Sequence, residues 1–193
     1  MNRIACLGFA LALLSVAAGT DTAKAQTANP PVGVSTPAST LSPVDYNFVA
    51  QANLGAPFQI DSGRVAEKKA TTANIRDYAH LMVVTHIPVV DALNSVLQHK
   101  GVAAPPNTLL HGAYDTMIAS LKAERGVALD RDYVQGQVDY QQGNAALFRY
   151  EIQNGTDPDL REFARHTLPK IEDHLQRALT LAKSGEFHTN SSE

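Results

Sequence analysis

Residues 75–96, which read IRDYAHLMVVTHIPVVDALNSV, decide the fold class of this chain. One stripe takes every third or fourth residue of this stretch, and it consists of Ile75, Ala79, Met82, His86, Val89, Leu93 and Val96. Side chains at that spacing lie on one face of an α-helix. The stretch therefore predicts an amphipathic helix that carries one imidazole in the middle of its apolar face.

A second stripe of the same form lies near the other end of the chain. It consists of Leu160, Ala164, Thr167, Ile171, His174, Ala178 and Leu181. Two separate helices are thus expected to carry one histidine each on the side that faces the core.

Capping residues predict where the helices begin and end. Ser42 followed by proline starts a helix over 43–69, and Thr71 or Thr72 starts the next one, which stops at Lys100 before a glycine. A shorter helix is expected at about 107–124, where Gly126 ends it, and two long ones at 129–154 and 158–183. Because no alternating strand pattern occurs in this region, the sequence predicts an all-α fold.

The chain matches itself when it is shifted by 85 residues. Six identical pairs arise without a gap, namely Asp45/Asp130, Val49/Val134, Arg64/Arg149, Thr71/Thr156, Arg76/Arg161 and Ala79/Ala164. The match predicts two helical hairpins of similar length, joined by a long connection that contains the short helix. Such a chain forms a four-helix bundle with one crossover.

The remaining parts of the chain are expected to lie outside the bundle, which we assign to 43–184. Residues 1–25 have the basic start, the apolar run and the small-residue cleavage site of a secretory signal peptide. Residues 26–42 have the composition of a disordered linker, and 185–193 that of a flexible tail. The only cysteine, Cys6, lies in the signal, so the exported protein has no thiolate ligand. We expect no membrane span after cleavage of the signal.

The charge of the chain limits its function. The formal net charge is -3 and the pI is about 6.1, with no basic run, so nucleic acid is not an expected partner. Serine nucleophile patterns, phosphate-binding glycine loops and paired catalytic carboxylates are all missing. The sequence gives no argument for an enzyme.

Five segments carry a family resemblance, and they read FVA at 48–50, GRVA at 63–66, YAHLMVVTH at 78–86, DYV at 132–134 and TLPKIEDHL at 167–175. In these segments the chain resembles the exported DUF4142 family of bacteria, over about residues 47–183. The resemblance implies a ferritin-like fold and a periplasmic location, and it implies no settled activity. The recurring polar positions of the family fall on Asp61, His86, Asp139 and His174. This chain departs from the family at Tyr140, where relatives usually have histidine, and at 84–85, where they usually have acidic residues.

These four residues give a metal-site hypothesis. Two imidazoles with one or two carboxylates suit Zn, Fe or Mn, so His86 and His174 would supply nitrogen, and Asp61 and Asp139 oxygen. Di-iron bundles use Glu-x-x-His on two helices, but here Val83 and Ile171 stand three residues before the histidines. The alternative is that both histidines are core residues hydrogen-bonded to Asp61, Gln141 or Tyr140. If they pair with Asp61, imidazole charging near pH 6.5 would alter the bundle.

The sequence therefore predicts an exported bacterial bundle that acts as a binding or envelope-stress protein. One alternative is a mononuclear metalloprotein that holds a divalent Zn, Fe or Mn ion and could have redox activity. Another is an interaction module that docks on an envelope protein. The distance between the two imidazoles separates these functions best, because rings within about 5 Å of each other could share a cation.

Overall fold

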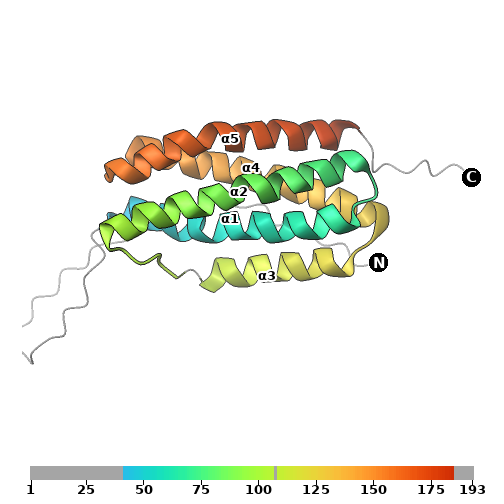
Figure 1. Ribbon diagram of the computed structural model, residues 1–193, viewed down its shortest axis with the longest axis horizontal. Helices are drawn as coiled ribbons and strands as arrows, with labels where there is room; N and C mark the ends of the chain where they lie inside the picture. The colour runs from blue at the N-terminus through green and yellow to red at the C-terminus, as the bar shows by residue number, and fades with distance from the viewer. Residues whose placement is uncertain (1–40, 107, 185–193) are drawn as a thin grey trace, which may run out of the picture. The chain divides into compact units, whose positions relative to one another are not determined.

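The computed structural model describes residues 41–106 and 108–184, which form five α-helices and no strand. α1 (Pro43–Lys69), α2 (Ala73–Lys100), α4 (Gly126–Asn154) and α5 (Pro158–Ser184) make a four-helix bundle, and α3 (Thr108–Ala123) lies outside it against α1 (Figure 1). The predicted all-α bundle with a short crossover helix is confirmed. The predicted signal peptide, the tail and all but the last two residues of the linker lie outside the described residues.

The helix boundaries follow from the capping residues. The Ser42 side chain accepts a hydrogen bond from the Asp45 amide at 3.2 Å, and Thr72, rather than Thr71, caps α2 through the amide of Ile75 at 3.3 Å. Gly101 ends α2 in the left-handed conformation, with φ of 63°. Gly126 has the same φ and is the first residue of α4, so α4 begins three residues earlier than predicted.

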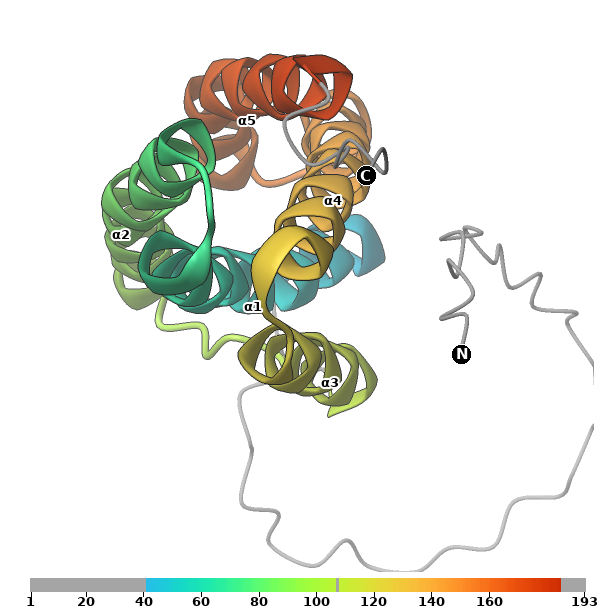
Figure 2. The same ribbon diagram turned by 90° about the vertical axis from the view of Figure 1, so that its right-hand side faces the viewer.

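The bundle consists of two antiparallel hairpins, α1 with α2 and α4 with α5 (Figure 2). Their helices have similar lengths, 27 and 28 residues in the first hairpin and 29 and 27 in the second, so the predicted pair of matching hairpins is confirmed. α3 returns the chain along the outside of α1 from one end of the bundle to the other. Lys69 fixes the far end of α3, because its Nζ donates to the carbonyls of Leu121 at 3.0 Å and Lys122 at 2.7 Å.

The residues of the internal repeat make equivalent contacts at opposite ends of the bundle. The Asp45 carboxylate accepts hydrogen bonds from the amide of Thr156 at 3.0 Å and from its hydroxyl at 2.6 Å. The Asp130 carboxylate accepts bonds from the same two groups of Thr71. Each hairpin thus holds the turn of the other through one buried aspartate, as an internal two-fold symmetry requires.

Small residues let α1 and α2 approach closely. A Cβ added to Gly63 would lie 2.8 Å from the carbonyl oxygen of Ala79, so only glycine fits there. The helical spacing of Leu54, Phe58, Asp61 and Val65 predicts the core-facing stripe of α1, with small residues beside it. Phe58 is buried as expected, Leu54 and Val65 are partly buried, and Asp61 is exposed. The buried residues of α1 are mostly small and consist of Asp45, Phe48, Val49, Ala50, Ala52, Gly55, Ala56, Phe58, Gln59, Ser62, Gly63 and Ala66.

The core has two apolar clusters. One is built around Ile75, Leu129 and Tyr133, and the other around Phe48, Phe148 and Leu160. The aromatic pair Tyr78/Tyr133 in the first has ring centroids 6.3 Å apart at 63°, and its repeat equivalent Phe48/Phe163 in the second has 6.1 Å at 62°. The two clusters therefore correspond to each other through the internal repeat.

Among the described helices, α2 alone is long and apolar enough to cross a membrane. Length and composition of this kind are also found in the core helices of soluble bundles. α2 buries one face against the other helices, and the residues on that face are Ile75, Tyr78, Ala79, Met82, His86, Leu93 and Leu97.

Candidate functional site

His86 of α2 and His174 of α5 lie side by side in the core. Their ring centroids are 5.2 Å apart, with an angle of 37° between the ring planes. Both residues are buried, with 4% and 3% of their surface exposed. The two stripes of the sequence thus bring their single histidines together, at the distance that the shared-cation hypothesis requires.

Each imidazole has one hydrogen bond to a neighbouring group. His86 Nδ1 lies 2.8 Å from the carbonyl oxygen of Met82, to which it can only donate. Thr85 donates its hydroxyl proton to the carbonyl of Leu81 at 2.6 Å, so its oxygen accepts from His174 Nε2 at 3.3 Å. These bonds assign opposite tautomers to the two rings. His86 Nε2 and His174 Nδ1 then carry the lone pairs that a cation needs.

The lone pair of His174 has no hydrogen-bond partner among the described residues. Nδ1 of this ring is fully buried and unbonded. Buried polar atoms without a partner in the protein are rare, and they usually bind a water molecule or an ion. The His174 ring therefore presents an unused acceptor inside the core.

Burial keeps both imidazoles neutral. It lowers the pKa of His86 to about 4, and it lowers that of His174 to about 4 with help from the neighbouring His86. The condition for a titration near pH 6.5, a pairing with Asp61, is not met, because Asp61 pairs with Arg64 instead. Two neutral imidazoles at physiological pH are in the form that binds metals.

The two predicted carboxylate ligands lie elsewhere. Asp61 has a side chain that is 60% exposed and pairs with Arg64 at 3.5 Å on the outside of α1. Asp139 is exposed on α4 and accepts a hydrogen bond from Gln135 at 2.9 Å. Of the four predicted ligands, the structure therefore brings together only the two histidines. The physical reason is helical phase, because both aspartates lie on the solvent side of their helices.

Two glutamines share the core with the histidines. Gln141 of α4 donates to the sulfur of Met82 at 3.5 Å, while its Oε1 is buried without a partner. Gln59 of α1 is fully buried, and within the described residues neither its Nε2 nor its Oε1 has a hydrogen-bond partner. α1 and α2 run antiparallel with Gly63 beside Met82, so Gln59, one turn back on α1, lies at the level of His86. We call Gln59, His86, Gln141 and His174 the central polar layer.

The sequence contains a signal for part of this layer. Gln141 stands at helical spacing with Val134, Val138 and Ala145, and the sequence predicts it as a polar partner of the histidines in the core; the structure buries it there. Gln59 was missed because its neighbours on the buried face are Ala, Gly and Ser, which give a weak helical period.

The donor set limits the kind of metal centre. Within residues 41–106 and 108–184, no group of three or more His, Cys, Asp and Glu is arranged to hold a metal ion. A carboxylate-bridged di-iron centre does not fit this layer. Any metal bound here would have two imidazoles and neutral oxygen donors as ligands.

The described residues also line two hollows. A cavity of about 10 Å³, lined by His86, Tyr140, Asn144 and Thr167 among others, lies next to the polar layer and has room for about one water molecule. A wider groove of about 530 Å³ runs between α2 and α5, with Leu81, Val84 and Arg177 along it. It reaches the layer through Tyr78, whose hydroxyl lies 3.3 Å from the His174 carbonyl oxygen.

Known structures share this architecture. A DUF305 fragment from Deinococcus radiodurans superposes with a TM-score of 0.66 at 13% identity, over 75% of this chain and 98% of the other. A DUF305 protein from Streptomyces coelicolor gives 0.62 at 12% identity, over 73% and 93%. At such identities the likeness shows the fold alone. No curated protein matches the chain.

The family is shown by the sequence match. Residues 30–181 match DUF4142, a domain of unknown function, and this range includes α1 to α4 and all but the last three residues of α5. The chain belongs to the DUF4142 family.

Proposed function

We propose that this protein is an exported binding protein whose bundle holds a transition-metal ion between His86 and His174. The single observation that carries the proposal is the pairing of two buried imidazoles from different hairpins, with the His174 acceptor unused. Of Zn, Fe and Mn, we favour Zn²⁺, because Mn prefers the carboxylates that the layer lacks.

The spacing of the rings is compatible with one shared ion. A metal bound about 2.0 Å from an imidazole nitrogen lies roughly 3.2 Å from the ring centroid. Two such rings at a tetrahedral angle have centroids about 5 Å apart, and the observed separation is 5.2 Å. The unbonded amide oxygens of Gln59 and Gln141 are the described groups best suited to complete the coordination.

Metal analysis of the purified protein tests this function. After equilibration with Zn²⁺, dialysis and elemental analysis, we expect about one equivalent in the wild type and none in the His86→Ala, His174→Ala double variant. The matched control is His111→Ala, His166→Ala, which removes two histidines whose side chains are 61% and 79% exposed. Circular dichroism verifies that each variant is folded. Equal zinc in all three proteins would refute the site.

Export to the periplasm is the second part of the proposal. It is supported by the signal-peptide features of residues 1–25 and by the Streptomyces coelicolor neighbour, which is described as a candidate secreted protein. Fractionation of cells that express the full chain, with mass spectrometry of the mature N-terminus, measures both location and cleavage near residue 25.

An envelope partner remains a prediction. Among the described residues, Val84 and Ile87 on the outer side of α2 are unusually exposed for their type, at 45% and 42%. A photo-crosslinking residue at Val84, compared with one at Asp139 on α4, would detect a protein that contacts this face in whole cells.

A further inference from the structure

Glu151, in the last turn of α4, is buried at the end of the bundle away from the polar layer. No part of it is exposed, and neither carboxyl oxygen has a hydrogen-bond partner of normal geometry in the part of the chain that the structure describes. The α4–α5 turn packs directly over this carboxyl, because a Cβ added to Gly155 would overlap Glu151 Oε1. Solvent therefore cannot hydrate the group while the turn is in place.

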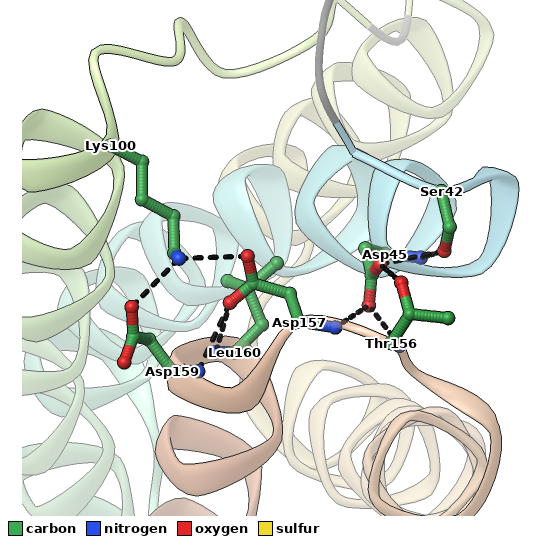
Figure 3. Close-up of polar contacts among 7 residues, drawn as sticks. All are labelled: Ser42, Asp45, Lys100, Thr156, Asp157, Asp159 and Leu160. Carbon is green, nitrogen blue, oxygen red and sulfur yellow. Dashed lines mark hydrogen bonds and ion pairs between the residues drawn. The ribbon is translucent and has the colours of Figure 1, made fainter.

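Glu151 lies beside a second buried acid, Asp45 of α1, and the two side chains interact. The Asp45 carboxylate already accepts bonds from the hydroxyls of Ser42 and Thr156, both at 2.6 Å, and from the amides of Thr156 and Asp157 at 3.0 and 3.2 Å (Figure 3). These four donors satisfy the ionised form of Asp45. They outweigh its burial and lower its pKa to about 2.

The other charged groups around Glu151 do not neutralise it. Asp157 adds a second negative charge, and Arg161 of α5 opposes it as the one cation within the described residues that lowers the pKa of Glu151. Arg161 donates its Nε–H to the carbonyl of Ile152 at 3.2 Å. Lys100 of α2 pairs with Asp157 at 2.8 Å and with Asp159 at 2.7 Å, as Figure 3 shows. Burial first, and then Asp45, raise the pKa of Glu151 to about 8.

The internal repeat shows that the aspartate clamp does not need this acid. At the opposite end of the bundle, Asp130 holds Thr71 in the same way. The residue equivalent to Glu151, 85 positions earlier, is Ala66, which is equally buried. One molecule therefore contains the same clamp with and without a buried carboxyl.

We propose that Glu151 is folded as a neutral carboxylic acid, and that its ionisation is an alkaline trigger that loosens the clamp between Asp45 and the α4–α5 turn. An ionised Glu151 would face the Asp45 carboxylate in a site without water. The turn must then move to admit solvent, and that movement breaks the bonds from Thr156 and Asp157. The clamp at Asp130 has Ala66 in place of Glu151, so this trigger acts on one of the two clamps only.

Thermal unfolding between pH 6.5 and 9.5 tests the proposal. The folded state binds the Glu151 proton more tightly than the unfolded state, so its stabilising effect is complete at low pH and is lost as the pH rises through about 8. We expect the wild-type midpoint to fall by roughly 5 °C or more over this range. Glu151→Gln and Glu151→Ala, which copies Ala66, should show a flat profile. Glu172→Gln, which removes an exposed acid paired with Arg149, should follow the wild type.

An NMR titration of the side-chain carboxyl ¹³C signals of the wild type tests the same proposal, and it needs no variant if either Glu151 variant fails to fold. The Glu151 signal should titrate near pH 8, and the amide signals of Thr156 and Asp157 should shift with it while that of Thr71 stays constant. A Glu151 midpoint near 4.5, or the same pH profile in wild type and Glu151→Gln, would overturn the proposal. Neither outcome depends on zinc binding at the polar layer.

Discussion

Acidification should destabilise the bundle through the two buried imidazoles. Each has a folded-state pKa of about 4, against 6.5 in the unfolded chain. Because the unfolded state takes up the protons first, the stability that the neutral rings provide is present above pH 6.5 and is lost as the pH falls toward 4. One pH unit corresponds to about 1.4 kcal/mol per group. The expected loss is therefore about 3 kcal/mol per imidazole.

Glu151 acts in the opposite direction over part of this range. Its raised pKa means that the folded state gains stability as the pH falls from 8 to 4.5. As the pH falls from 6.5 to 4.5, the two imidazoles lower the free energy of unfolding and Glu151 raises it. The net effect should be a loss of about 1.4 kcal/mol of unfolding free energy per pH unit. Removing both imidazoles should reverse the sign of the slope of unfolding free energy against pH. Removing the Glu151 carboxyl should double that slope.

Urea unfolding at half-unit pH steps from 4.5 to 7 measures these slopes. The proteins to compare are wild type, His86→Gln, His174→Gln, the double variant and Glu151→Gln, each followed by circular dichroism. Glutamine keeps a polar group of similar size in the layer. Equal slopes in the wild type and the double variant would refute the reasoning. So would NMR titration of either ring with a midpoint near 6.5 in the folded protein.

Three further predictions concern the packing and the clamps. Gly63→Ala should lower the free energy of unfolding by about 1–3 kcal/mol, because the added Cβ meets the α2 backbone. Gly143→Ala is the control: it has open space around it and should raise the free energy of unfolding by about 0.5–1 kcal/mol. Equal effects of the two variants in urea unfolding would contradict the close approach of α1 and α2. Asp45→Asn should cost about 1.5–3 kcal/mol at pH 7 through its lost charge-assisted bonds, again measured in urea. Lys69→Met should speed amide exchange in the last turn of α3, whereas exposed Lys68→Met should not.

The sequence predicted those parts of the fold that local rules determine. Ser42 and Gly101 gave the ends of α1 and α2 correctly, because capping depends on a few neighbouring residues. The match between Asp45 and Asp130 gave the hairpin symmetry, which the structure confirms through their equivalent bonds to threonine. These signals do not depend on knowing which face of a helix is buried.

The site was predicted only in part because it depends on helical phase. His86 and His174 stand among large apolar residues, so their stripes were clear and the two rings do meet. Asp61 was placed on the wrong face, because the core side of α1 is made of small residues that leave little hydrophobic period. The same feature concealed Gln59. A search for a face of Ala, Gly and Ser would have oriented α1 correctly.

The differences between the two hairpins support a function in the polar layer. Where the repeat builds the scaffold, the halves agree, as in Asp45/Asp130 and in the matched aromatic pairs. At three of the four layer positions they differ, since His86 corresponds to Ile171, His174 to Val89 and Gln141 to Ala56, whereas Gln59 corresponds to another amide, Asn144. A bundle that needed only stability could keep apolar residues in both halves, since unpaired buried polar atoms cost free energy. The unpaired polar groups of the layer therefore support our proposal of a bound ligand, and zinc titration of the histidine variants tests it.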